Sequence, residues 1–90
     1  MMDKTETEIA RGERAAQLLA EPLLIEAFET LKLEYLQTWQ NSPARDVEGR
    51  EELWLMIKLL HRLHGELERV MDNGKVAKAT LIQRIGQALR

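Results

Sequence analysis

The sequence predicts an all-α protein: an antiparallel helical hairpin with two short flanking helices. Apolar side chains recur every three or four residues over most of the chain, which is the period of an α-helix. Turn-forming residues, among them Pro22, Pro43 and Gly74, divide this pattern into four segments. The length of 90 residues corresponds to a single helical domain, residues 1–90, with a small core.

The segment 46–72 carries the strongest helical pattern in the chain. Asp46 is its expected N-cap, and Gly74 can adopt the left-handed conformation that ends a helix. Six of its residues form one stripe, with alternating spacings of four and three: Leu53, Ile57, Leu60, His64, Leu67 and Met71. Other apolar residues lie on further sides of its first half, which indicates burial against more than one neighbour.

The segment 22–40 is predicted to be the other arm of the hairpin. Proline is favoured in the first turn of a helix, and Asn41-Ser42-Pro43 is typical of a turn. The short turn brings Trp39 close to Trp54, which predicts an aromatic cluster at this end. The alternative is a partner-binding site, since tryptophan is enriched at binding hot spots.

Two shorter helices are expected to flank the hairpin, over residues 6–20 and 76–89. Thr5 and Glu8 form the pattern of a capping box at the start of the first. Gly12 lies on its packing face, where a small residue allows another helix to approach closely. The Asp72-Asn73-Gly74 stop separates the last helix from the hairpin.

Charge divides the chain into an acidic and a basic end. Residues 1–41 contain eight acidic and four basic side chains, a net charge of −4. The tail after Gly74 contains no acidic residue, and its cations form a candidate basic surface: Lys75, Lys78, Arg84 and Arg90. We interpret this tail as packing near the acidic half, within one subunit or between two. Nucleic-acid binding is the alternative, not favoured because the cations are few and lack interleaved aromatic residues.

The residue types exclude several kinds of chemistry. The chain has no cysteine, and it lacks a nucleophile motif and a glycine-rich phosphate loop. His61 and His64 could face one side of a helix with Glu68, but His64 falls on the apolar stripe, so we expect no metal site. We therefore expect neither an enzyme nor a bound cofactor. No apolar run is long enough for a membrane span.

Some apolar residues of the hairpin lie off the seam between its arms. They form a candidate interaction surface: Leu33, Leu36, Trp54, Leu55 and Leu59. One hairpin cannot bury all of them, and the segment 6–20 offers mainly alanine and glycine as cover. The sequence therefore predicts a homo-oligomer or a complex with another protein.

Three pieces of the chain between Arg11 and Lys75 resemble small helical bacteriophage and prophage proteins of the virion or DNA-packaging gene neighbourhood: RGERAAQLLAEPLLIEAFETLKLEYLQTW, SPARDVEGREELW and NGK. The resemblance covers about two thirds of the chain and carries no defined activity or site residue. It implies a non-enzymatic phage structural or packaging component that acts by protein–protein assembly, in the host cytoplasm or the virion. A nucleic-acid-binding, small terminase-like packaging subunit and a small inhibitor of a host protein are the alternatives.

Overall fold

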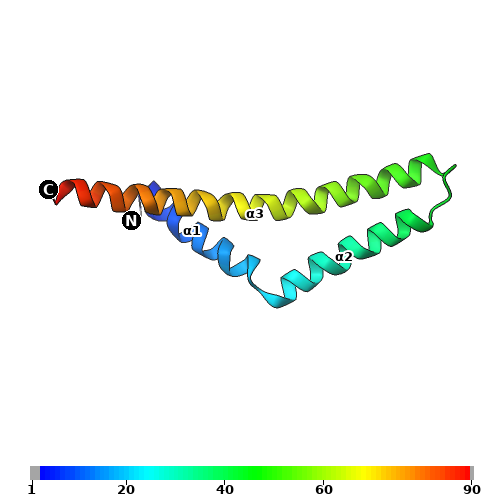
Figure 1. Ribbon diagram of the computed structural model, residues 1–90, viewed down its shortest axis with the longest axis horizontal. Coiled ribbons are helices and arrows are strands. Elements are labelled where there is room, and N and C mark those ends of the chain that lie inside the picture. The colour runs from blue at the N-terminus through cyan, green and yellow to red at the C-terminus, as the bar shows by residue number, and fades with distance from the viewer. Residues whose placement is uncertain (1–2, 90) are drawn as a thin grey trace. The chain divides into compact units, whose positions relative to one another are not determined.

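The computed structural model describes residues 3–89, which form three helices and their short connections. These helices are α1 (Lys4–Leu19), α2 (Pro22–Asn41) and α3 (Val47–Ala88) (Figure 1). Within this part of the chain there is no β-strand, so the predicted all-α class is confirmed. The helices form two compact units. The terminal unit combines α1 with α3 from Glu66 onward, and the turn unit combines α2 with α3 up to Gly65.

The predicted helix break at Asp72-Asn73-Gly74 is wrong, and so is the separate helix over residues 76–89. α3 runs without interruption through this stretch, and none of the described glycines has a positive φ. Asp, Asn and Gly are each less favourable than alanine inside a helix, glycine by about 1 kcal/mol. Packing of α1 against this stretch supplies the compensating contact.

Glycine lets α1 and α3 approach each other closely in the terminal unit. A Cβ atom added to Gly12 would lie 2.6 Å from the Cα of Gly74, and one added to Gly74 would lie 2.7 Å from the Cα of Gly12. Ala15 and Ala77 are buried beside these glycines, at 3% and 7% exposure. Backbone therefore packs on backbone, as expected of a crossing built from small residues, and Gly74 serves this approach instead of a helix end.

The start of α1 differs from the prediction by two residues. Asp3, not Thr5, is the N-cap, and its carboxylate accepts a hydrogen bond of 2.8 Å from the backbone N–H of Glu6. Aspartate is a stronger N-cap than threonine, because a carboxylate also interacts favourably with the positive end of the helix dipole. The capping-box prediction is therefore wrong.

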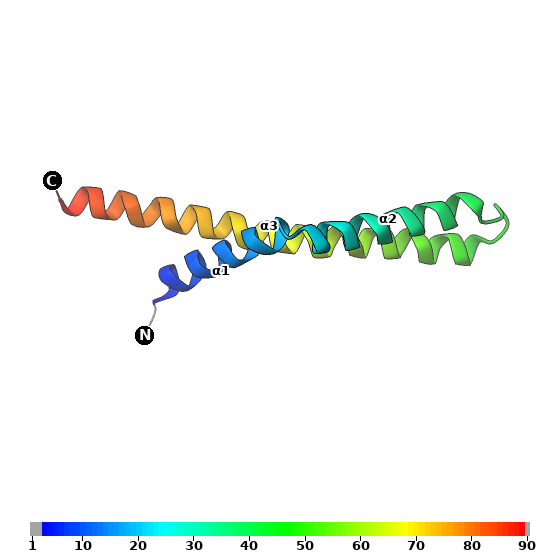
Figure 2. The same cartoon turned by 90° about the horizontal axis from the view of Figure 1, so that it is seen from below.

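α2 and the first part of α3 contact each other in the turn unit (Figure 2). The rings of Phe28 and His64 meet edge to face, with centroids 5.4 Å apart. Ile57 is the residue of the predicted stripe that is buried, at 7% exposure, whereas Leu60 is half-buried. Two helices alone cannot enclose a core, and none of the residues of α2 is buried.

Arg50 holds the turn between α2 and α3 together, a role that sequence periodicity does not reveal. Its Nη1 donates to the carbonyl oxygens of Trp39 and Ser42, at 3.0 and 3.1 Å, and to the hydroxyl of Ser42 at 2.8 Å. Its guanidinium also lies 4.3 Å from the centre of the Trp39 ring. The expected contact between the two tryptophans is thus replaced by a cation–π contact on each, since the ammonium of Lys58 lies 4.6 Å from the Trp54 ring.

Candidate interaction surface

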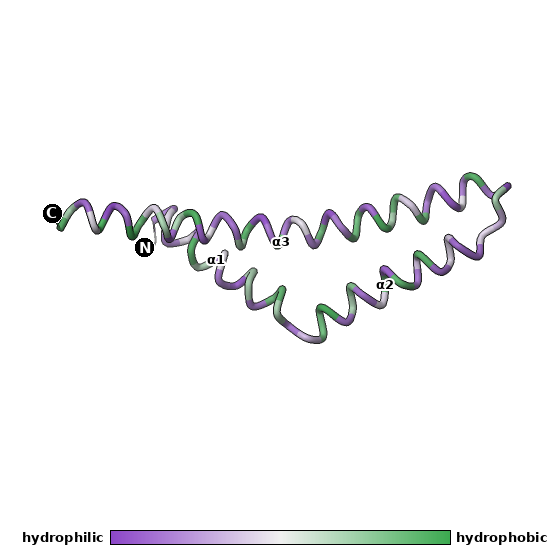
Figure 3. Tube along the Cα trace, viewed as in Figure 1, coloured by the Kyte–Doolittle hydropathy of each residue, from purple (hydrophilic) through white to green (hydrophobic). Residues whose placement is uncertain are grey.

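Exposed apolar side chains are the dominant surface feature of the described residues. Among residues 3–89, three hydrophobic residues are buried, namely Ala15, Ile57 and Ala77, while fourteen large ones are exposed. The exposed set is Leu23, Ile25, Leu31, Leu33, Val47, Trp54, Leu55, Met56, Leu59, Leu63, Val76, Ile82, Ile85 and Leu89. Figure 3 shows such apolar positions recurring along the whole of α3. Isolated exposed apolar residues are ordinary, so what matters is which of these are contiguous.

The five residues of the predicted interaction surface do not form one patch. Leu33 is 56% exposed, but it lies about 140° around α2 from Phe28, on the outer face. Leu36 is half-buried. Trp54 is half exposed beneath the Lys58 ammonium. The structure therefore separates these three from Leu55 and Leu59, the remaining pair.

Leu55 and Leu59 belong to a longer apolar stripe on α3, which we call the outer stripe. It consists of Leu55, Met56, Leu59 and Leu63, which are 54%, 43%, 63% and 57% exposed. At 3.6 residues per turn, these four side chains fall within an arc of about 100°. Ile57, which is buried, and His64, which contacts Phe28, lie on another side of the helix. The outer stripe is thus turned away from α2.

Met56 and Leu63 are not among the residues of the predicted interaction surface. Their spacing signals a second seam, because Met56, Leu59 and Leu63 repeat at intervals of three and four. Periodicity alone does not say which of two adjacent stripes a neighbouring helix covers. In the structure α2 contacts α3 at His64, on the side of the helix where Ile57 is buried.

Acidic side chains lie at both ends of the outer stripe. Glu48 and Glu52 precede it on α3 and are exposed. Glu66 follows it and accepts a hydrogen bond from Nη2 of Arg69 at 2.8 Å. That hydrogen bond and the negative charge of Glu66 raise the pKa of the Arg69 guanidinium. The N-terminal end of the stripe is therefore the more acidic one.

The predicted basic surface is only partly contiguous. Lys75, Lys78 and Arg84 are all exposed on α3, and Arg90 lies outside the described residues. Arg84 lies about half a turn around the helix from Lys75. It lines a hollow of about 310 Å³ in the terminal unit together with Lys4 and Glu8. Arg84 is thus separated from the two lysines.

Lys75 and Lys78 instead share a face with exposed apolar residues near the end of α3. This tail face consists of Lys75, Lys78, Ile82, Ile85 and Leu89, spaced by three, four, three and four residues. Ile82, Ile85 and Leu89 are 60%, 51% and 83% exposed. The intervals are those of a coiled-coil seam, so the tail face is a stripe suited to contact another helix.

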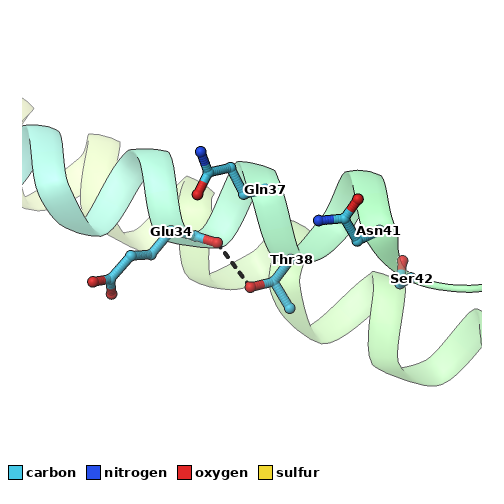
Figure 4. A pocket seen from close by; sticks show the side chains of 5 residues that line it. All are labelled: Glu34, Gln37, Thr38, Asn41 and Ser42. Carbon is cyan, nitrogen blue, oxygen red and sulfur yellow. Dashed lines mark hydrogen bonds between the residues drawn. The ribbon is translucent and has the colours of Figure 1, made fainter.

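An open hollow lies at the end of α2 in the turn unit. It has a volume of about 480 Å³ and opens widely at the end of α2, where its lining is Glu34, Gln37, Thr38, Asn41 and Ser42 (Figure 4). The Thr38 hydroxyl donates to the Glu34 carbonyl oxygen at 2.8 Å. The hollow is open to solvent, and its lining contains one carboxylate, that of Glu34.

We expect the chain to bind no zinc or iron tightly. Within the described residues no three His, Asp or Glu side chains are grouped so as to hold a metal ion, and His64 lies against Phe28. Metal analysis of untagged protein, purified without added metal, checks this expectation. Stoichiometric metal that disappears in the His61→Ala, His64→Ala double variant would contradict it.

None of the helices in residues 3–89 combines the length and apolar character of a membrane span. Comparison with protein-family models, with curated proteins and with solved structures finds no match for this chain.

Proposed function

We propose that this chain is a non-enzymatic assembly protein that acts by associating with further copies of itself. The exposure of fourteen large apolar side chains among the described residues, against three buried hydrophobic ones, supports this proposal. Fully burying a large apolar side chain contributes about 1.5–3 kcal/mol. The isolated chain forgoes part of that contribution at each exposed position, and association recovers it.

The biological setting that we propose is a bacteriophage structural or DNA-packaging component, found in the host cytoplasm or the virion. It rests on the resemblance carried by the stretch between Arg11 and Lys75. Copurification of the chain with purified phage particles would support a virion role. Retention on duplex DNA that weakens steeply with salt would instead support the nucleic-acid-binding class.

A dilution series followed by sedimentation velocity tests self-association. We expect the wild type to be oligomeric at micromolar concentration. The Leu55→Glu, Leu59→Glu double variant should assemble only at a concentration at least about tenfold higher than the wild type needs, because two charges enter the apolar contact. The matched control is Leu33→Glu, a similarly exposed leucine outside the outer stripe, which should assemble like the wild type. A wild type that stays monomeric at high micromolar concentration would refute self-association.

A further inference from the structure

We propose that copies of this chain associate head to tail, with the tail face of one copy docked on the outer stripe of the next. This inference rests on the proposed self-association and names the two surfaces that meet. The outer stripe lies in the turn unit and the tail face lies in the terminal unit, both on α3. The occupant of the outer stripe is the tail face of a second copy, as residue spacing and charge indicate.

The two surfaces have the same residue spacing. Glu52, Met56, Leu59 and Leu63 are separated by intervals of four, three and four residues. The intervals are identical in the tail face: Lys78, Ile82, Ile85 and Leu89. With the two helices parallel, each residue of one set faces the corresponding residue of the other. The register is an offset of 26 residues, from Glu52 to Lys78.

This register pairs opposite charges and apolar side chains at the same time. Lys78 faces Glu52, and one turn earlier Lys75 faces Gly49, the neighbour of Glu48. The apolar positions of both surfaces are 43–83% exposed in the single chain, so they are accessible to a partner. An antiparallel arrangement would place Lys75 opposite Glu66, whose carboxylate already accepts a hydrogen bond from Arg69, and Lys78 opposite Leu63. Glu52 would then lie opposite Leu89 and lose its cationic partner. Charge complementarity therefore favours the parallel arrangement.

The net charges of the turn unit and of the tail after residue 72 also favour contact between the outer stripe and the tail face. Residues 21–65 contain eight acidic and five basic side chains, whereas residues 73–89 contain three basic side chains and no acidic one. Contact between two outer stripes would bring like charges together, whereas contact between stripe and tail joins opposite charges. In a dimer formed by this contact, one chain still has an unused outer stripe and the other has an unused tail face. Further copies can bind at both ends, so assembly continues into a ring or a filament.

Mixing two single-surface variants tests this arrangement. Leu59→Glu damages the stripe and leaves the tail face intact, and Ile85→Glu does the reverse. Each alone should be monomeric at concentrations where the wild type assembles. Mixed in equal amounts, they should form a species of twice the chain mass and nothing larger, because each pair retains one intact contact. Sedimentation velocity or native mass spectrometry distinguishes these outcomes.

The mixing experiment can refute the arrangement directly. Assembly of Ile85→Glu alone at wild-type strength, or a mixture that stays monomeric, would overturn it. Both substituted residues are more than half exposed, so the monomers should keep wild-type helicity by circular dichroism. Leu63→Glu and Ile82→Glu form a second pair with the same expected behaviour, which decides the question if one variant of the first pair unfolds.

A charge exchange tests the register. Glu52→Lys and Lys78→Glu should each raise the apparent Kd about three- to tenfold, because an exposed attraction becomes a repulsion. The double variant, with both charges exchanged in one chain, should return to near the wild-type Kd. A double variant as weak as the two single changes combined would overturn the register. The wild type can assemble while the mixed variants stay monomeric or the charge-exchanged double variant stays weak. Either result contradicts only this arrangement. A wild type that is monomeric refutes the proposed self-association itself.

Discussion

Gly74→Ala should destabilise the protein even though alanine is the better helix former. The added methyl group would lie 2.7 Å from the Cα of Gly12, a backbone atom that cannot turn aside. α1 must then move away from α3, which also loosens the contact at Ala15 and Ala77. Overpacking of this kind typically costs about 1–3 kcal/mol. Urea or thermal unfolding at one fixed protein concentration measures the loss, because assembly makes apparent stability depend on concentration.

Gly65→Ala is the matched control, since it makes the same substitution on the same helix. A Cβ atom at Gly65 meets nothing within 4 Å, so this variant should gain up to about 1 kcal/mol of helix propensity. We expect the two variants to differ by about 1–3 kcal/mol, the cost of overpacking, because the gain in helix propensity is common to both. Equal stabilisation by Gly65→Ala and Gly74→Ala would show that α1 and α3 do not cross closely at Gly12.

Ile57→Ala should cause the other large loss of stability. Ile57 is the large apolar side chain that is buried within the described residues, at 7% exposure. Truncating a buried isoleucine to alanine costs about 2–5 kcal/mol, because it removes apolar contact and leaves a cavity. A domain of this size has a total stability of only about 5–15 kcal/mol. Chemical unfolding should therefore show a clearly lowered midpoint with the fold still helical.

Ile25→Ala provides the same change of side chain in the same unit, at a residue that is 47% exposed. Its cost should stay within about 1 kcal/mol. Leu60→Ala should fall between the two, because Leu60 is half-buried although periodicity places it at the centre of the stripe. If Ile25→Ala and Ile57→Ala were equally destabilising, burial of Ile57 between α2 and α3 would be wrong.

Which apolar side chains of α3 are exposed could be predicted only in part. Leu55 and Leu59 were identified correctly as exposed, because they lie off the seam that contains Ile57. Met56 and Leu63 were not, since two apolar stripes with similar spacing run side by side on α3. Which stripe stays exposed depends on the side from which α2 approaches, and the angle between two helices is a tertiary property.

Local chemistry alone determined where α2 and α3 begin. Pro22 starts α2, because proline suits a first helical turn, and Asp46 accepts a hydrogen bond from the backbone N–H of Gly49 at the start of α3. These signals act over a few residues, so they can be recognised without knowing the fold.

Only the tertiary structure decided the conformation of Asp72-Asn73-Gly74. The same three residues favour a helix end when isolated, since glycine readily adopts the left-handed conformation. In the folded chain the backbone of α1 at Gly12 occupies the space that a side chain at Gly74 would take. This contact requires a helical conformation at Gly74. A preference of about 1 kcal/mol per residue is smaller than the packing that it opposes. The helix therefore continues, and α3 carries both the outer stripe and the tail face.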